Sequence, residues 1–256
     1  MQRLTVATLN IRNLADRWDE RLPLLLADMS ALQPDVLGLQ EVVFPLQQDR
    51  LIGAAGEGRY ESHRGWAGRP EYGNSLLVRR PLAATDVERL DLGYNRSALR
   101  ATLRPEGAPA VLVAVTHLHH VTADEAIRDE QVRILLDWLA GAPTWDAQVV
   151  VGDFNAEPDE PAAERIRAGG YRSAFAEATG ADPAVTWPSG LQAPAMDTDG
   201  PPGCLDYVWL RGDVRLTAAR LVFDRPAVGD PTLYPSDHVG IAAELDVGRP
   251  APAGSD

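Results

Sequence analysis

Short apolar runs that end in polar residues recur along this chain, and they strongly limit the folds it can adopt. The runs are rich in β-branched side chains and too short for helices, which favours β-strands. They cover residues 4–9, 36–39, 75–78, 111–115, 149–151, 205–210 and 239–245. The sequence therefore predicts a fold built mainly from β-sheet.

Two further segments space their apolar side chains as a helix does, on one stripe. The first stripe is formed by Leu22, Leu25, Leu26, Met29 and Leu32. The second is formed by Ile127, Ile134, Leu135 and Trp138. We expect this second helix to open with a capping box, Thr122-x-x-Glu125, and to close at Gly141. Each apolar stripe needs a surface to cover, and a sheet face supplies one.

These elements predict an α/β (α+β) architecture, a four-layer αββα sandwich in which helices flank two packed, mainly antiparallel sheets. No repeat, low-complexity tract or linker interrupts the chain before its end. We therefore expect one domain over residues 1–247. Residues 248–256, rich in Pro, Ala and Gly, are expected to form a disordered tail.

Charge and cysteine content exclude several classes of protein. The 256 residues carry 37 acidic side chains against 24 basic ones, all arginine, for a net charge of −13. This argues against a broad basic surface for nucleic acid. One cysteine, Cys204, excludes an internal disulfide and a cysteine-cluster metal site. No apolar run approaches the roughly 18–20 residues that span a membrane. We expect a cytoplasmic protein without stable membrane insertion, with a monomer as the default state.

Polar residues able to bind a metal or a phosphate stand at or near the ends of most of these runs. They are Asn10, Glu41, His117, Asp153, Asn155, Asp206, Asp237 and His238. Taken singly, each has an ordinary interpretation as a turn residue, a cap or an exposed charge. Loops at strand ends gather on one rim of a sandwich, so the whole set is expected to converge there.

Oxygen donors dominate this set, which suits a hard cation, Mg²⁺ or Mn²⁺, better than zinc. Asp206 lies inside an apolar run, where a carboxylate must be paired or ligated. An aspartate held against a histidine makes the imidazole a competent base. The sequence therefore predicts that Asp206 pairs with His238.

At this point a family resemblance becomes specific, because six short motifs occur in one order. They are Thr8-Leu-Asn10, Leu39-Gln-Glu41, Thr116-His117-Leu, Gly152-Asp153-Phe-Asn155, Leu205-Asp206-Tyr207 and Ser236-Asp237-His238. In this order they resemble the endonuclease/exonuclease/phosphatase superfamily, which has the deoxyribonuclease-I-like fold. The glycine of Val239-Gly240 resembles sphingomyelinase-like and bacterial members. The resemblance covers residues 3 to about 246.

The resemblance implies a role for each site residue. Glu41 would be the principal metal ligand, with Asn10 and Asp237 close to the metal. Asp153 would orient the attacking water or take its proton. Asn155 would hold a phosphate oxygen. Such a scheme is coherent, since in-line attack needs a positioned water and donors that meet the developing charge.

The two histidines would complete this scheme. His117 would donate to a phosphate oxygen as charge builds in the transition state. His238, oriented by Asp206, would act either as a general base or as an acid that polarises the phosphate. Residues alone do not decide between these two roles.

Three further residues are predicted to bind substrate. Asn74 belongs to a Gly-Asn pair that resembles the start of a family strand. Arg64 belongs to a segment of arginines and aromatic residues suited to a phosphate and a ring or headgroup. Trp187 opens a Pro- and Gly-rich stretch leading to Asp206, and long loops of this kind often shape binding sites.

The main hypothesis is a metal-dependent hydrolase of a phosphodiester or phosphomonoester. A divalent-metal-dependent endonuclease or exonuclease on DNA or RNA is the alternative. Because an acidic body repels a long polyanion, we expect a small molecule or lipid headgroup rather than duplex DNA as substrate. A hypothesis from another class is a non-catalytic binding module that kept the fold.

Overall fold

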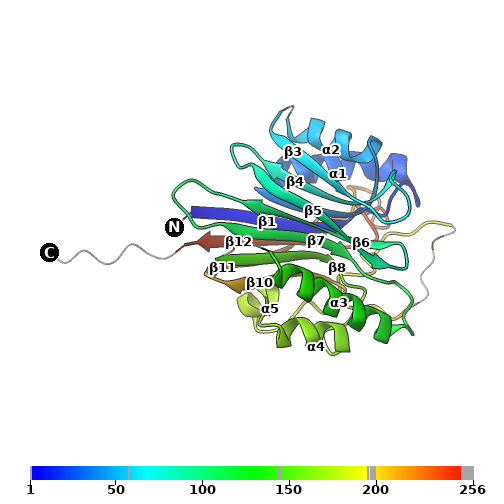
Figure 1. Ribbon diagram of the computed structural model, residues 1–256. Coiled ribbons are helices and arrows are strands. Elements are labelled where there is room, and N and C mark those ends of the chain that lie inside the picture. The colour runs from blue at the N-terminus through cyan, green and yellow to red at the C-terminus, as the bar shows by residue number, and fades with distance from the viewer. Residues whose placement is uncertain (1, 57, 143–145, 195, 197–199, 249–256) are drawn as a thin grey trace.

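The computed structural model describes residues 2–56, 58–142, 146–194, 196 and 200–248. Its strands form two six-stranded sheets (Figure 1). The first sheet has the strand order β11 (Val214–Val222), β12 (Gly240–Val247), β1 (Gln2–Asn10), β2 (Val36–Val43), β4 (Tyr72–Arg79) and β3 (Tyr60–Gly65). The second has the order β5 (Ala84–Gly93), β6 (Arg96–Leu103), β7 (Val111–His117), β8 (Ala147–Asp153), β10 (Asp206–Gly212) and β9 (Arg172–Ser173).

Both sheets are mixed but mainly antiparallel, as predicted. The parallel pairs are β1 with β2 and β7 with β8. Each parallel pair is connected through a helix, because parallel neighbours need a crossover connection. These two crossover helices are α1 (Trp18–Leu32) and α3 (Glu125–Ala140), and they contain the two predicted apolar stripes.

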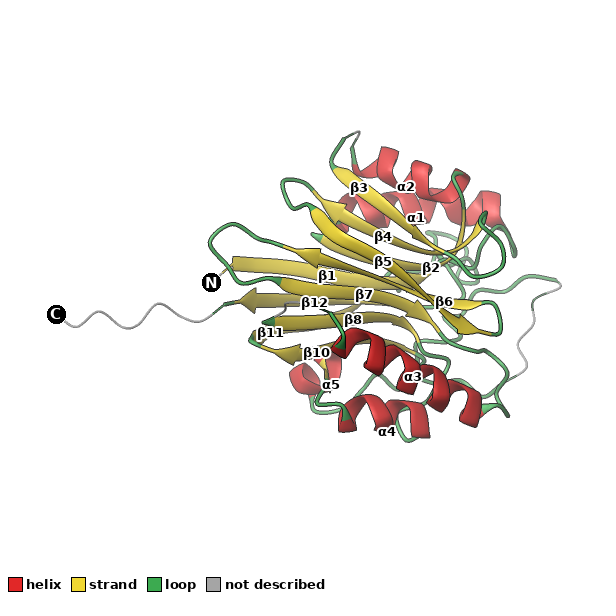
Figure 2. Cartoon of the chain, viewed as in Figure 1, coloured by secondary structure: helices red, strands yellow, loops and turns green. Residues whose placement is uncertain are grey.

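Helices cover both outer faces, which confirms the predicted four-layer sandwich (Figure 2). Helix α1 and helix α2 (Leu46–Ala55) pack on the first sheet through one buried cluster. Helix α3 and helix α4 (Pro161–Ala168) pack on the second sheet through another. The short helix α5 (Ala174–Thr179) lies on the same side as α3 and α4 in Figure 1.

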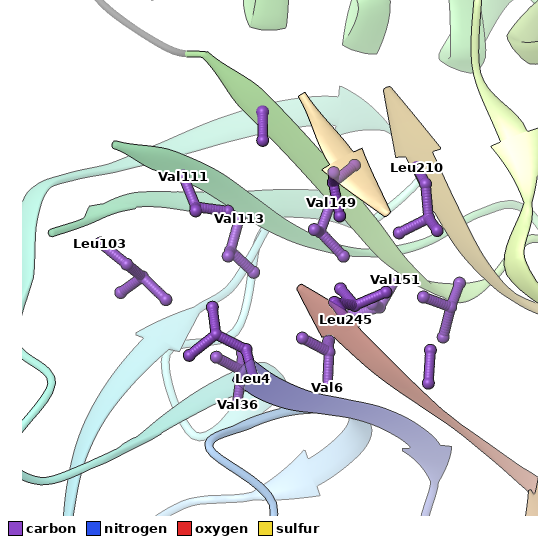
Figure 3. Packing of buried hydrophobic residues seen from close by; sticks show 14 of the residues in the cluster. Leu4, Val6, Val36, Leu103, Val111, Val113, Val149, Val151, Leu210 and Leu245 are labelled. Atoms are coloured by element: carbon purple, nitrogen blue, oxygen red, sulfur yellow. The ribbon is translucent and has the colours of Figure 1, made fainter. Parts of the chain in front are cut away.

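The core between the sheets follows the period of two in the strands. Leu4 and Val6 point inward from β1, and Val111 and Val113 point inward from β7 (Figure 3). Their neighbours point outward under the helices, so these strands are buried on both faces. This double burial explains why their sequences are almost continuously apolar.

The sheets approach closely at Gly38 of β2. A Cβ atom placed there would lie 2.4 Å from Cγ2 of Val151 on β8. Only glycine fits this contact without movement of the opposite strand. On β2 this contact lies three residues before Glu41, and on β8 it lies two residues before Asp153.

One detail of the predicted helices is wrong. Helix α3 begins at Glu125 with Asp124 as its N-cap, and no side chain caps it. The expected capping box at Thr122 does not form, because the helix begins later and Thr122 lies two residues before its N-cap. The helix does end before Gly141, whose N–H donates to the carbonyl of Asp137.

The predicted tail falls almost entirely outside the described residues, which end at residue 248. Among the described helices, none combines the length and apolar character needed to cross a bilayer.

Candidate active site

The inner-face pattern of the strands continues past the core into a polar cluster. Asn10 follows the inward positions of β1, His117 those of β7 and Asp153 those of β8. Asp206 opens β10 directly opposite Asp153, because β8 and β10 are antiparallel. The same alternation that fills the core with valine and leucine therefore brings these polar side chains together at one end of the sheets.

A pocket of about 770 Å³ opens over this cluster. Eight of the predicted site residues line it: Asn10, Glu41, His117, Asp153, Asn155, Trp187, Asp237 and His238. Asp206 is fully buried and lies behind His238. The structure therefore brings together nine side chains that the sequence spreads over more than two hundred residues.

Asp153 occupies the centre of the cluster. Its Oδ2 atom accepts a 3.0 Å hydrogen bond from Nδ2 of Asn10, and its Oδ1 atom accepts one of 2.9 Å from the backbone N–H of Asn155. Nε2 of His117 lies 3.4 Å from Oδ2, and Nε2 of His238 lies 3.8 Å from it. Burial raises the pKa of Asp153 to about 6, although the charge of His238 acts to lower it.

His238 is held by the predicted partner. Its Nδ1 atom lies 2.9 Å from Oδ2 of Asp206. Burial acts to lower the pKa of His238, but the carboxylates of Asp206, Asp153 and Asp237 raise it to about 10. In this structure His238 is therefore an imidazolium at neutral pH, with Nδ1–H donating to Asp206 and Nε2–H turned toward Asp153.

The pKa of His117 is shifted in the opposite direction to that of His238. Nη1 of Arg96 lies 2.9 Å from both of its ring nitrogens. A guanidinium can only donate, so the ring nitrogen that it meets carries no proton. Burial first, and then the charges of Arg96 and His238, lower the pKa of His117. The two histidines therefore face Asp153 as one neutral and one charged ring.

Asn155 is fixed by a turn after β8. Its backbone has a φ of 48°, a left-handed conformation that asparagine tolerates better than most residues. Its Nδ2 atom donates 3.1 Å to the carbonyl of Leu118, which anchors the side chain on the strand end beyond His117. Within the part of the chain that the structure describes, the side-chain oxygen has no such anchor, and the residue lines the pocket.

Glu41 and Asp237 are the other two predicted carboxylates that line the pocket. Glu41 sits in the register shift between β2 and β4, with a φ of 57°. Its Oε2 atom accepts a 2.7 Å hydrogen bond from Asn13. Oδ2 of Asp237 accepts a 3.3 Å hydrogen bond from Nε1 of Trp187 and lies 3.6 Å from Nε of Arg12.

Two predicted substrate-binding residues lie elsewhere. Asn74 is buried in β4, where its Nδ2 atom donates 2.8 Å to the carbonyl of Ser97, so it joins the two sheets instead of reaching substrate. Arg64 stacks over Phe44 at 5.1 Å and lines a separate hollow of about 510 Å³ with Trp66 and Arg89. Neither side chain lines the main pocket.

Several residues that line the pocket were not predicted from the sequence. Arg12 and Asn13 come from the loop after β1, and Tyr94 and Arg96 come from the turn between β5 and β6. An arginine such as Arg12 or Arg96 is too common in a sequence to indicate a site by itself. Asn13, however, follows Asn10 closely enough to have been included with it.

A buried arginine organises the loop after β1. Arg21 of α1 is fully buried, and its guanidinium donates only to backbone carbonyls. The acceptors are the carbonyls of Ile11, Arg12, Asn13, Ala15, Asp16 and Pro235. Burial lowers the pKa of Arg21 to about 10. One side chain thus ties the loop that carries Arg12 and Asn13 to the segment that carries Asp237.

A family model described as the Endonuclease/Exonuclease/phosphatase family matches residues 7–238. This range includes all of the residues gathered in the pocket from Asn10 to His238. The chain belongs to this family. Members of the endonuclease/exonuclease/phosphatase family are generally hydrolases that act on phosphoesters.

Among proteins of known name, the chain is similar to nocturnins. It is 28% identical to nocturnin from Rattus norvegicus over 265 aligned positions, which cover 90% of the chain and 59% of the relative. It is 27% identical to nocturnin from Homo sapiens, covering 90% of the chain and 58% of the relative. The chain spans about three-fifths of the length of these relatives.

Solved structures share the fold. An endonuclease/exonuclease/phosphatase protein from Bacteroides vulgatus superposes with a TM-score of 0.77 at 21% identity, covering 96% of this chain and 100% of that one. TDP2 from D. rerio gives 0.79 at 20% identity, over 96% and 100%. The human nocturnin catalytic domain gives 0.75 at 24% identity, over 96% and 94%.

The family is metal-dependent, and the donor set in this pocket suits a divalent metal. Glu41, Asp237, Asp153 and the amide oxygen of Asn10 are all oxygen donors lining one pocket. Asp153, Asp206 and His238 also present ligand atoms within 4.8 Å of one another. The hydrogen bond to Asp206 and the pairing with Asp153 already account for that second group. Glu41 and its neighbours are therefore the better fit.

Proposed function

We propose that this protein is a divalent-metal-dependent phosphoester hydrolase that cleaves a phosphodiester or phosphomonoester by in-line attack of an activated water. One observation carries the proposal. The buried carboxylate of Asp153 faces two histidines at the floor of an open pocket: His117, whose pKa is lowered, and His238, whose pKa is raised. A carboxylate, a neutral imidazole and an imidazolium in contact supply a proton acceptor and two donors within one site.

Asp153 is the group suited to activate water. Its raised pKa of about 6 brings it near neutral pH, where a general base combines sufficient basicity with the deprotonated state. Asn10 and the N–H of Asn155 hold both carboxylate oxygens in place. The carboxylate is thus oriented before substrate arrives, which lowers the reorganisation needed in the transition state.

The remaining groups suit the phosphate. His238, charged and oriented by Asp206, donates from Nε2 toward the oxygens on which charge accumulates. This favours the acid role over the base role among the two that the sequence left open. His117, backed by Arg96, and the side chain of Asn155 are placed for the same oxygens. Donors aimed at developing charge are commonly the largest single contribution to such catalysis.

Glu41, Asn10 and Asp237 would hold the metal, with Mg²⁺ or Mn²⁺ expected from their oxygen donors. When bound, the ion supplies Lewis-acid stabilisation of a phosphoryl oxygen. All other steps of the proposal rest on side chains of this chain.

A small phosphoester fits the acidic protein better than duplex DNA, because a net charge of −13 repels a long polyanion. The alternative, a nuclease, draws support from two neighbours. The D. rerio TDP2 structure holds a single-stranded DNA product, and the human nocturnin domain holds a sulfate anion. Arg12, Arg69 and Arg96 in the pocket suit either substrate. Degradation of single-stranded DNA at low salt, without turnover of small phosphodiesters, would favour the nuclease.

The deciding experiment is hydrolysis of bis(p-nitrophenyl) phosphate and p-nitrophenyl phosphate with Mg²⁺ or Mn²⁺ and in EDTA. We expect metal-dependent turnover by the wild type and its near loss in His238→Ala and Glu41→Ala. Val228→Ala, at a fully exposed position that does not line the pocket, serves as the matched control. Activity that survives both site substitutions would overturn the proposal, as would wild-type protein that hydrolyses neither ester.

A further inference from the structure

The turn between β5 and β6 carries an exposed tyrosine at the rim of the pocket. Gly93 pairs with Arg96 across the hairpin, so Tyr94 and Asn95 form a two-residue turn. Tyr94 lines the pocket and is 62% exposed, although tyrosine is usually at least half buried in folded proteins. A large aromatic ring is therefore presented to solvent next to the reactive groups.

This position is unfavourable for a tyrosine backbone. Tyr94 and Asn95 have φ values of 54° and 57°, the left-handed conformation of a type I′ turn. Such turns favour Asn, Asp or Gly at both positions, and a bulky side chain there is strained. Asn95 matches the preference and Tyr94 does not. Strain kept at a pocket rim points to a use for the side chain itself.

The ring belongs to a contiguous aromatic shelf. Its centroid lies 5.1 Å from that of His119, with the two planes inclined by 51°, and His119 lies 5.5 Å from His120, edge to face at 70°. His119 is itself held by Asp124, whose Oδ2 atom lies 2.8 Å from Nε2. All three rings line the pocket. His119, the middle ring of the shelf, is two residues along the chain from His117.

Cationic side chains border this shelf. Arg69 and Arg96 both line the pocket, and within the described residues neither guanidinium has a carboxylate within ion-pairing distance. Arg96 also donates to His117, which places positive charge between the shelf and the proposed phosphate position.

We infer that Tyr94, His119 and His120 form a subsite for a planar aromatic ring of the substrate, which stacks on Tyr94 and is bordered by the inclined rings of the two histidines. The ring would belong to a nucleobase-type group attached through a sugar or linker to the phosphate. This deepens, and rests on, the proposed phosphoesterase function. An aromatic face would also attract a quaternary ammonium headgroup. The two arginines beside the shelf oppose a cation and favour a ring that carries further negative charge.

Three ligands that share one phosphate monoester separate these possibilities: adenosine 5′-monophosphate, ribose 5-phosphate and phosphocholine. Their dissociation constants are measured by calorimetry in EDTA, so that turnover does not interfere. We expect the nucleotide to bind at least about fivefold more tightly than ribose 5-phosphate, the lower end for stacking of one base on an aromatic side chain. Equal affinities, or tighter binding of phosphocholine, would overturn the inference.

Three variants test the role of the ring. Tyr94→Phe should keep the preference for the nucleotide, and Tyr94→Asn should bring the ratio of the two dissociation constants close to one. Asparagine suits this turn, so Tyr94→Asn should also keep or raise the melting temperature. A merely structural tyrosine would instead give a lower melting temperature and an unchanged ratio. Val228→Ala, exposed on another loop, should change neither quantity.

The two proposals fail separately in these measurements. A protein that hydrolyses phosphoesters but shows no preference for the nucleotide keeps the proposed function and loses the ring subsite. A protein that prefers the nucleotide through Tyr94 but turns over no phosphoester keeps the subsite as a binding site and loses the hydrolase.

Discussion

His238 and Asp206, which are 32 positions apart in the chain, meet through a 2.9 Å contact between Nδ1 and Oδ2. Asp206 is fully buried, and its second oxygen, Oδ1, has no hydrogen-bond partner among the described residues. The side-chain hydrogen bond of Asp206 therefore goes to the imidazole of His238. It holds Nδ1–H of the imidazole and leaves Nε2 to face Asp153 and the pocket.

Asp206→Asn tests this relationship. The amide removes the charge that orients and protonates His238, so we expect kcat to fall by about 10² to 10⁴, the usual worth of a general acid or base. KM should change little, because Asp206 does not line the pocket. Steady-state kinetics on a phosphodiester measure both. Asp246→Asn, another buried aspartate that pairs with Arg3 and Arg215 at the far end of β12, should retain kcat.

The raised pKa of His238 predicts how stability depends on pH. The folded state holds this proton more tightly than the unfolded chain, so its stabilisation is complete below pH 6.5 and is lost as pH rises through about 10. The raised pKa of Asp153 acts in the same direction between pH 3.8 and about 6. The lowered pKa of His117 acts oppositely, below pH 6.5.

Comparison with His238→Asn isolates the contribution of His238. In EDTA, the melting temperature of the wild type should exceed that of the variant most near pH 6.5, and the difference should shrink steadily toward pH 10. Thermal unfolding followed by circular dichroism at each pH is sufficient. A difference that stays constant across this range would show that the imidazole contributes packing and not charge.

Metal binding distinguishes the two sets of donors. A metal that binds only the folded state raises the melting temperature. We expect Mn²⁺ to raise it for the wild type and for Asp206→Asn, and to raise it far less for Glu41→Gln. The titration is a thermal shift against Mn²⁺ concentration after removal of metal with EDTA. Loss of the shift in Asp206→Asn alone would instead place the metal among Asp153, Asp206 and His238.

Arg21→Met should be strongly destabilising. The substitution removes the donor of six carbonyls, of which those of Ile11 and Pro235 are fully buried, and each unsatisfied buried group costs about 1–3 kcal/mol. Because solvent can reach part of the loop, we expect a total loss of at least about 3 kcal/mol in the free energy of unfolding. Urea denaturation measures it. Arg165→Ala, which breaks an exposed pair with Asp129, should cost under about 1 kcal/mol.

The strands that sequence reasoning found are buried on both faces. Their apolar runs are nearly continuous because helices cover one face and the opposite sheet covers the other. Strand β6 is buried too, but Ser97, Arg100 and Thr102 interrupt its apolar run and it was missed. Strand β5 was missed because it is an edge strand whose side chains are mostly exposed. An alternating, charged edge strand resembles a loop in sequence, so neither β5 nor the turn after it could be placed in advance.

The same limit explains what was missed and misassigned in the site. Asn10, His117 and Asp153 end buried strands, so their convergence could be predicted from strand ends alone. Tyr94 and Arg96 sit on the unpredicted hairpin and gave no such signal. Asn74 resembles the others in sequence, but its side chain reaches Ser97 on the opposite sheet. That contact depends on how the two sheets pack, which strand patterns do not determine.

Gly152→Ala tests how closely the strands beneath the site are packed. Gly152 has a φ of 149°, and an added Cβ would lie 2.0 Å from the carbonyl oxygen of Thr116 on β7. Because that atom belongs to the parallel strand's backbone, relief requires the strands carrying His117 and Asp153 to separate. We expect a loss of about 2–4 kcal/mol in the free energy of unfolding, combining strain and overpacking.

Gly180→Ala is the matched control for that substitution. Gly180 also has a positive φ, 96°, but an added Cβ there would meet nothing within 4 Å. Its replacement should cost only the conformational penalty, about 1–2 kcal/mol. Urea denaturation of both variants, with phosphodiester turnover below the unfolding transition, separates the two effects. Gly152→Ala should lose activity even while folded. Equal stabilities and equal activities of the two variants would show that β7 and β8 can accommodate the added methyl group.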